Sequence, residues 1–250
     1  MATLAAHVRP LSDRRFFTGM AYALAATAFV GFAPTYYLVG LNASPTPVLT
    51  GRLHVHAALT TAWMLLLIAQ TQLVAAGRRD VHRVLGFVGA GLATATFVTG
   101  VFVALNSGRR VHTAATADTL ADPYVFLMFP MMSVCLFGVF VLLAVVKRNR
   151  PDTHKRLMLL ATVSLIGPAL ARIVTMAVKG FGLVGVPGVV GAVLLMNVFI
   201  AAIAIRDYKT RGSLHPATLW GGGFFLLTEP LRFVVAYSEP WQNFARHLMS

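Results

Sequence analysis

Four histidines stand at the ends of apolar stretches in this chain of 250 residues. His54 and His56 precede one such stretch, and His82 follows it within Asp80-Val-His82-Arg83. The segment Asp152-Thr-His154-Lys155 repeats that order of acid, histidine and base, with its Asp and His both 72 positions later. Neutral imidazole is a common ligand of metal ions and of haem iron. These histidines are therefore the first candidates for chemistry.

His82 and His154 form the first candidate site. If they lie on different helices of one bundle, they supply the two axial ligands that a b-type haem requires. Arg83 and Lys155 stand directly beside them and could hold the haem propionates by charge-assisted hydrogen bonds. The alternative is a pair of ordinary helix starts that lie among lipid head groups and water.

His54 and His56 are candidates for a second cofactor site. Two residues apart on a helix, they point about 200° away from each other, so only one of them can face the bundle. A second haem would need a partner on the helix expected over 123–146, where the position 72 residues after His56 is Met128. Methionine is a permitted haem ligand.

A second set of ionisable residues is expected at the opposite end of the bundle. Charged groups inside membrane helices are costly, and they mark candidate substrate or ion sites. The set comprises Arg172, Glu229, Arg232 and Asp122, together with His54 and His56. It could anchor propionates, bind a quinone head group or bind an anion. Alternatively, Glu229 neutralises Arg232 or Arg172 and pins two helices together.

The composition defines the elements that must position these residues. Hydrophobic residues make up 57% of the chain and charged residues 12%, with a mean hydropathy of +0.73, whereas roughly a quarter of a soluble domain is charged. About 20 apolar residues suffice to cross a bilayer as a helix. We expect one all-α membrane domain over 1–250 with seven crossings, the second to fifth forming its core: 16–38, 53–76, 84–105, 123–146, 157–178, 183–205 and 216–236.

The net charge of +13 is explained by topology. With the N-terminus inside and the C-terminus outside, 14 of the 21 Lys and Arg residues fall on the inner side and five on the outer side. This asymmetry is what the positive-inside rule describes. The sequence therefore predicts a multi-pass protein of the bacterial inner membrane with the lipid bilayer as partner, and it does not indicate nucleic-acid binding.

Several stretches of the second to fifth expected helices resemble a group of uncharacterised bacterial multi-pass membrane proteins. They are His54-Val-His56, Trp63, Gln70-Thr-Gln72-Leu, His82-Arg-Val-Leu-Gly86 and His154-Lys-Arg-Leu-Met-Leu-Leu-Ala161. More distantly, the histidine spacing is similar to that of the transmembrane di-haem b-type cytochromes, which include ferric reductases. That resemblance implies that His82 and His154 ligate one haem.

Two functions follow as expectations. The first is a haem-b redox protein that passes electrons to or from a quinone or another redox partner. The second is a cofactor-free transporter, or a structural or assembly protein, that uses Arg172, Glu229 and Arg232 for a small anion or a proton. A metal-dependent hydrolase built from His54 or His56 with Glu229 and Asp122 has suitable ligand types but no recognisable ligand spacing.

Overall fold

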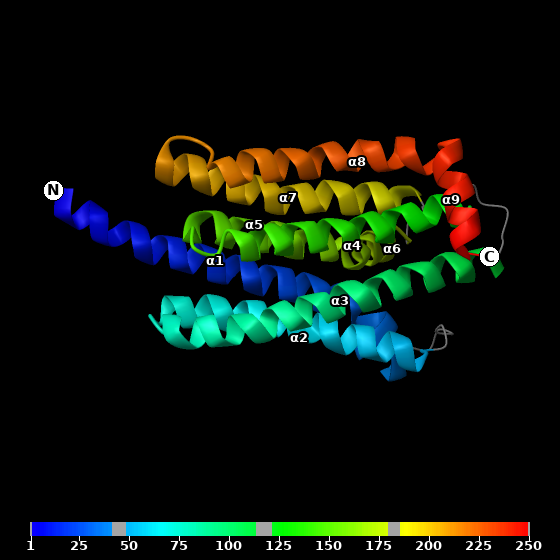
Figure 1. Cartoon of the computed structure of the whole chain (residues 1–250), viewed down its shortest axis with the longest axis horizontal. Coiled ribbons are helices and arrows are strands. Elements are labelled where there is room, and N and C mark those ends of the chain that lie inside the picture. Colours follow the sequence, from blue (N-terminus) through cyan, green and yellow to red (C-terminus); the bar gives the residue numbers. More distant parts are fainter. Residues whose placement is uncertain (1, 42–48, 114–121, 180–185, 250) are drawn as a thin grey trace.

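The computed structural model describes residues 2–41, 49–113, 122–179 and 186–249, and within these ranges every regular element is a helix (Figure 1). The long α-helices are α1 (Ala2–Phe32), α2 (Gly51–Ala75), α3 (Arg79–Thr113), α4 (Pro123–Val146), α5 (Pro151–Leu165), α6 (Gly167–Lys179), α7 (Val186–Arg211), α8 (Gly223–Ala236) and α9 (Glu239–Met249). Shorter turns are the π-helices η1 (Ala33–Tyr37) and η4 (Ala217–Gly222) and the 3-10 helix η2 (Val39–Leu41).

Among the described residues, five helical stretches are long and apolar enough to cross a membrane: Asp13–Tyr37, Gly51–Ala75, Arg79–Arg109, Pro123–Val146 and Gly188–Arg211. The pair α5 and α6 would add a sixth if the two count as one bent span. The described part of the chain is thus all-helical, with five or six stretches that are long and apolar enough for a bilayer. The expected bounds of 123–146 match α4 at both ends.

The prediction of a single helix over 157–178 is wrong, because this stretch is divided between α5 and α6, which meet at a bend of 48°. Pro168 explains the break. It has no backbone N–H to donate, and its ring clashes with the carbonyl oxygen four residues earlier, on Ser164. The α5 helix therefore ends at Leu165, and α6 begins at Gly167.

The segment expected over 216–236 is helical in two pieces, the π-helix η4 followed directly by α8. Its polar residues reduce its apolar length: Thr228, Glu229 and Arg232 are all buried on α8. Beyond it, α9 lies across one end of the bundle (Figure 1). The indole nitrogen of Trp241 on α9 donates to the carbonyl oxygen of Tyr124 on α4 at 2.8 Å.

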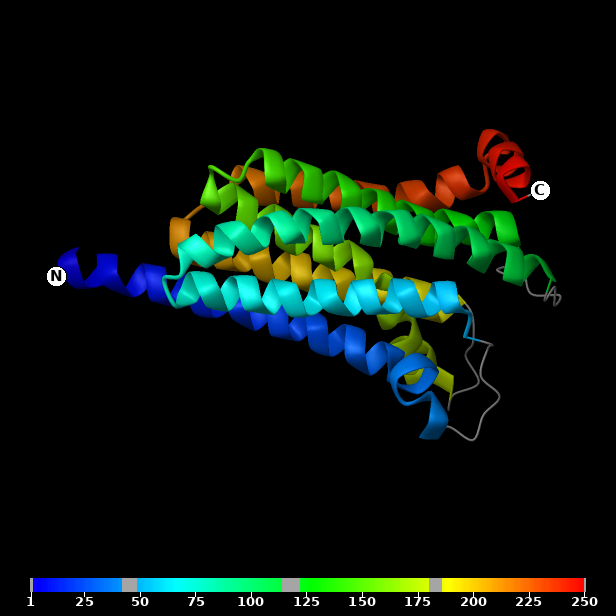
Figure 2. The same ribbon diagram turned by 60° about the horizontal axis from the view of Figure 1, so that its bottom comes forward.

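The hydrophobic core extends beyond the second to fifth expected helices. Phe137 on α4, Leu160 on α5, Leu24 on α1 and Ile203 on α7 are each at most 1% exposed and belong to one cluster. Figure 2 shows α1 and α2 side by side along one face of this bundle. The core therefore draws on α1 and α7 as well as on α4 and α5.

Trp63 connects α2 to the centre of the bundle. Its indole nitrogen donates to Thr162 Oγ1 on α5 at 3.2 Å, and both side chains are buried. Its ring also meets Phe137 of α4 edge-on, with 5.0 Å between ring centroids. A buried indole needs a hydrogen-bond acceptor, and here the acceptor lies 99 positions along the chain.

The connections from α2 to α3, from α4 to α5 and from α7 to η4 lie at the end of the bundle that holds the N-terminus (Figure 1). We use "inner end" as a label for this end and "outer end" for the end that α9 covers, after the orientation expected from the sequence. His82 and His154 each lie in the first turns of a helix that starts at the inner end. The fold thus brings the two Asp-x-His segments to one end of the molecule.

Candidate functional site

His82 of α3 and His154 of α5 face each other at the inner end. Their ring centroids are 6.4 Å apart and their ring planes are almost perpendicular, at 88°. Both side chains are half-buried. The structure therefore brings together the two histidines that the repeated segment singled out, across 72 positions of sequence.

The His154 ring is held in one tautomer by α4. Its Nδ1 lies 2.8 Å from the carbonyl oxygen of Ala144. Because a carbonyl oxygen can only accept, Nδ1 carries a proton, and in the neutral imidazole Nε2 then keeps the lone pair. Histidines that ligate metals almost always donate their second ring N–H in this way, which fixes the ring orientation.

His82 and Gln70 each have a buried polar atom without a hydrogen-bond partner among the described residues. Its Nδ1 is buried and has no hydrogen-bond partner among the described residues. Gln70 of α2 donates from Nε2 to the His82 backbone oxygen at 3.2 Å, while its own Oε1 is also buried without a partner in the described part of the chain. Buried polar atoms without partners are rare and point to an additional group, such as a water or a ligand.

The distance between the two ring centroids is close to that of two imidazoles bound to one metal ion. A bond from a metal to an imidazole nitrogen is about 2.0–2.1 Å long, so two imidazoles on opposite sides of one iron have ring centres roughly 6 Å apart. The 6.4 Å between His82 and His154 is close to that value. Next along α3, Gly86 leaves contact room, because a Cβ there would have Gln70 Nε2 as its nearest neighbour at 3.9 Å.

The small residues of α3 further from His82 serve close packing. A Cβ added at Gly89 would lie 3.0 Å from Leu66 of α2, and Ala93 is buried in the core. Space for a planar group beside His82 is therefore confined to the inner end of α3.

The basic neighbours of the two histidines differ in their surroundings. Arg83 is exposed at the inner end. Lys155 instead forms ion pairs with Asp13 of α1 at 2.5 Å and with Asp152 at 2.6 Å. The Lys155 ammonium group, which was expected to bind a haem propionate, is thus paired with the carboxylates of Asp13 and Asp152.

A buried ion pair between Arg156 and Asp207 lies next to the site and was not predicted from the sequence. The Arg156 guanidinium binds the Asp207 carboxylate through Nη2 and, at 2.9 Å, through Nε. The two side chains are 2% and 1% exposed. Thr218 Oγ1 at 2.5 Å and the His215 N–H at 3.1 Å also donate to Asp207. This pair fixes the first turn of α5, on which His154 lies.

Asp13 extends this network to α1. It accepts from Lys155 of α5 and from Arg206 of α7, with the Arg206 nitrogens 3.3 Å from Asp13 Oδ1. One signal in the sequence could have identified the network. The chain has only eight acidic residues, and Asp13 and Asp207 both stand beside a basic residue at the end of an apolar stretch.

His215 closes the inner end between α7 and η4. It is 8% exposed, and its Nδ1 accepts a hydrogen bond from the Ala217 N–H at 3.0 Å. Burial lowers the pKa of His215, and the positive charges of Arg156 and Arg211 lower it further. The opposing effect of Asp207 and Asp152 is smaller. These surroundings therefore favour the neutral imidazole over the charged one.

The two histidines of α2 have separate partners, as their spacing on a helix predicts. His54 is exposed and its Nδ1 lies 3.2 Å from the Tyr36 hydroxyl. His56 is partly buried and contacts Thr99 Oγ1 of α3 at 3.0 Å. Met128, the position that would have to ligate a second haem, packs in a cluster with Ala236 of α8.

The outer candidates lie on different elements. Glu229 and Arg232 pair along one face of α8, with 2.8 Å from Arg232 Nη2 to Glu229 Oε1. Arg172 of α6 lies over the ring of Phe32 at the end of α1, 4.5 Å from its centroid. Asp122 caps α4 by accepting from the Tyr124 and Val125 N–H groups at 2.8 and 3.2 Å. Asp122 thus has a structural role.

The Glu229–Arg232 pair retains unsatisfied atoms. Both side chains are buried, at about 5% and 4% exposure. Glu229 Oε2 and Arg232 Nε have no hydrogen-bond partner among the described residues. Burying a charged pair is favourable only when the remaining polar atoms are also satisfied, so this pair is the second position where a small polar group is expected.

Within the described ranges, no group of three or more His, Cys, Asp or Glu side chains could hold a metal ion. Haem iron needs only two protein ligands, so this result bears on the hydrolase and not on the histidine pair. No model of a protein family, no curated protein and no solved structure matches the chain. Both resemblances stated from the sequence therefore stay predictions.

Proposed function

We propose that the chain is a membrane-embedded electron-transfer protein that binds one b-type haem between His82 and His154. The observation that carries the proposal is the facing histidine pair, with ring centroids 6.4 Å apart. Two further features support it. The Ala144 carbonyl holds His154 in the tautomer of a ligand, and the Nδ1 atom of His82 has no hydrogen-bond partner in the described part of the chain.

Different residues would bind the iron and the propionates of a haem at this site. His154 offers Nε2, and the Arg156–Asp207 pair keeps its helix start in place. His82 faces it from α3. Arg83 is exposed at the inner end and is the cation left to bind a propionate, since Lys155 is paired with carboxylates. A bound haem supplies a one-electron redox couple, which a quinone or another redox partner would use.

We further propose seven crossings in the bacterial inner membrane, with the N-terminus inside. Five or six spans follow from length and composition, and the continuous stretch of η4 and α8 would be the remaining one. The connections from α2 to α3 and from α4 to α5 lie at the inner end (Figure 1). They contain Arg78 and Lys147, Arg148 and Arg150, as the positive-inside rule expects for an inner side. The carboxylate and guanidinium on α8 would then lie in the outer half of the membrane.

An absorption spectrum tests the haem proposal. The protein is expressed with adequate haem supply, purified in detergent, and measured oxidised and after reduction with dithionite. We expect a Soret band and a split visible pattern on reduction, both lost in His82→Ala and in His154→Ala. The control is His247→Ala, an exposed histidine on α9, which should keep the spectrum. A folded but colourless wild-type protein would overturn the proposal.

The buried Glu229–Arg232 pair favours one second candidate, the movement of a small anion or a proton. This function is supported by Glu229 Oε2 and Arg232 Nε, which have no hydrogen-bond partner among the residues that the structure describes. Flux through protein reconstituted in vesicles should be lost in Glu229→Gln and Arg232→Gln and kept in Glu239→Gln, which changes an exposed carboxylate on α9. Equal flux in all three variants would exclude this role.

A further inference from the structure

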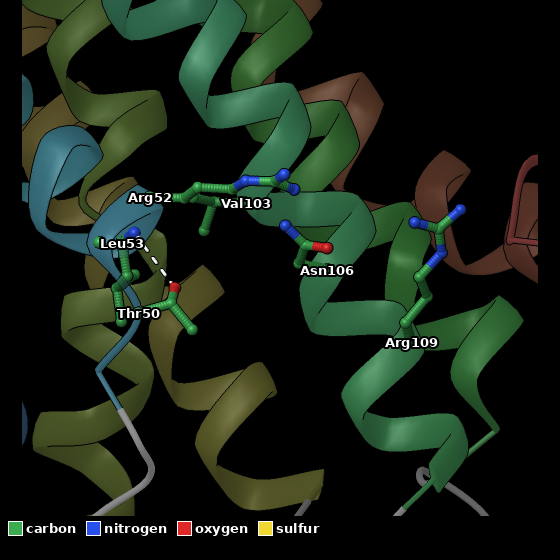
Figure 3. A pocket seen from close by; sticks show the side chains of 7 residues that line it. Thr50, Arg52, Leu53, Val103, Asn106 and Arg109 are labelled. Atoms are coloured by element: carbon green, nitrogen blue, oxygen red, sulfur yellow. Dashed lines mark hydrogen bonds between the residues drawn. The ribbon is translucent and has the colours of Figure 1, made fainter.

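A cleft of about 580 Å³ opens at the outer end of the bundle, between the start of α2 and the last turns of α3. Figure 3 shows the Arg52 side chain extended from α2 towards α3, where Asn106 and Arg109 lie on successive turns. The lining residues are Thr50, Gly51, Arg52, Leu53, Val103, Asn106 and Arg109. This cleft is at the opposite end of the bundle from the facing histidine pair.

The polar lining of the cleft is cationic. Arg52 and Arg109 bring two guanidinium groups from two different helices, and Asn106 adds an amide that can donate. None of the described residues that line the cleft is acidic. Guanidinium groups are the side chains best suited to bind phosphate oxygens, because their N–H groups bind pairs of oxygens in a fixed geometry.

The helix backbone adds to this preference for an anion. Thr50 caps α2, and its hydroxyl and carbonyl oxygens take the Leu53 N–H. Gly51 and Arg52, the first two residues of the 25-residue α2, line the cleft. Unpaired N–H groups at the start of a long helix carry a partial positive charge that favours anions.

Arg109 is placed by the C-terminal helix. Its Nε and Nη2 approach the carbonyl oxygens of Met249 and Leu248 at 3.4 and 3.5 Å. These long contacts position the guanidinium from α9 and leave it capacity for a stronger acceptor, since it has five N–H donors. The α9 helix therefore positions Arg109 through two main-chain carbonyl oxygens, which carry no formal charge.

The cleft lies at the ends of two proposed membrane spans. The apolar stretch of α2 begins at Gly51 and that of α3 ends at Arg109, so Arg52 and Arg109 would lie at the boundary between membrane and water. We propose that this cleft binds a phosphate group, held by Arg52, Arg109 and Asn106 with the start of α2. The phosphate could come from a phospholipid of the outer leaflet or from a soluble phosphate compound.

Binding to detergent-purified protein tests the site. The probes are inorganic phosphate, a short-chain phosphatidic acid and a short-chain diacylglycerol that lacks the phosphate, each followed by native mass spectrometry and by the shift in unfolding temperature. Arg52→Gln and Arg109→Gln should each weaken phosphatidic acid binding by about tenfold, the loss expected for one charge-assisted hydrogen bond. Arg79→Gln, an exposed arginine at the other end of α3, is the control.

Each outcome has a definite meaning. Binding of phosphatidic acid alone supports a lipid head group as the natural ligand, and binding of both phosphate compounds supports a general phosphate site. Equal affinity for the diacylglycerol, or equal weakening by all three arginine variants, would overturn the proposal. Asn106→Leu provides an uncharged second test, because it should weaken phosphate binding without a change in net charge.

Discussion

At the scale of single residues, the inner end depends on a few charged side chains removed from water. Asp207 accepts hydrogen bonds from Arg156, Thr218 and the His215 backbone. A buried guanidinium that loses its carboxylate becomes an uncompensated charge, and such changes are strongly destabilising. The candidate haem ligand His154 lies two positions before Arg156, so the same pair supports the geometry of the site.

Asp207→Asn should lower the free energy of unfolding by about 3 kcal/mol, the lower end of the range for breaking a buried pair. Urea unfolding in detergent, followed by tryptophan fluorescence, measures the loss. Asp80→Asn is the matched control. Its pair with Arg78 spans 3.8 Å, and the two side chains are 62% and 74% exposed, so its effect should stay below about 1 kcal/mol. Equal effects of the two variants would contradict the role given to Asp207.

His215 should make stability depend on pH. Folding lowers the pKa of its imidazole, so the folded chain binds this proton less readily than the unfolded chain does. The contribution is fully present above the unfolded pKa of about 6.5 and is lost as the pH falls below it, towards the lower folded pKa. Unfolding temperature measured from pH 8 to pH 5 reports the loss.

The control for this pH dependence is His215→Asn. An asparagine oxygen can still accept from the Ala217 N–H, as Asn does at helix starts, but it does not titrate. The variant should therefore have a flatter stability profile below pH 6.5. A profile identical to that of the wild type would show that other groups cause the pH dependence.

At the scale of elements, close crossings between helices depend on glycine. Gly31 of α1 packs directly on the backbone of α6: an added Cβ would contact the Ala169 carbonyl oxygen and lie 2.6 Å from its Cα. Backbone cannot move aside as a side chain can. The crossing of α1 and α6 therefore requires glycine at this position, as small residues often allow in membrane bundles.

Gly31→Ala should destabilise the protein by about 1–3 kcal/mol, the usual cost of overpacking. Gly19→Ala is a matched control on the same helix, because nothing lies within 4 Å of its added Cβ. That change should be neutral or stabilising by up to about 1 kcal/mol through helix propensity. Thermal unfolding in one detergent compares them, and a loss of similar size at both positions would refute the close crossing.

Local patterns in the sequence predicted the elements and the histidine pair. Apolar runs placed α4 correctly at both ends, and the repeated Asp-x-His segment pointed to His82 and His154. The break before Pro168 was missed because hydropathy continues across it. Asp207 was missed because its partner Arg156 lies 51 positions away, and no short-range spacing encodes such a contact. The charged residues at the outer end were grouped only by their expected position along the helices. That position does not specify which helices are neighbours.

At the scale of the whole molecule, the number of crossings decides which side each site faces. Single cysteines can be introduced in a Cys135→Ser background at Ser213, in the exposed turn after α7, and at Asn243, on the exposed side of α9. With η4 and α8 as the seventh crossing, a membrane-impermeant maleimide should label position 243 in intact cells. Position 213 should react only after permeabilisation, and labelling of both on one side would contradict seven crossings.

The ion pairs of Asp13 form with residues that are synthesised much later than Asp13 itself. Asp13 enters the membrane region with the first helix, but Lys155 follows 142 residues later and Arg206 193 residues later. Until those residues are synthesised, the carboxylate of the first helix has neither of its native cations. A ribosome-bound chain that stops before α7 therefore displays an incompletely paired acid at the membrane surface. The Asp13 carboxylate acquires both of its cationic partners only when α7 is complete.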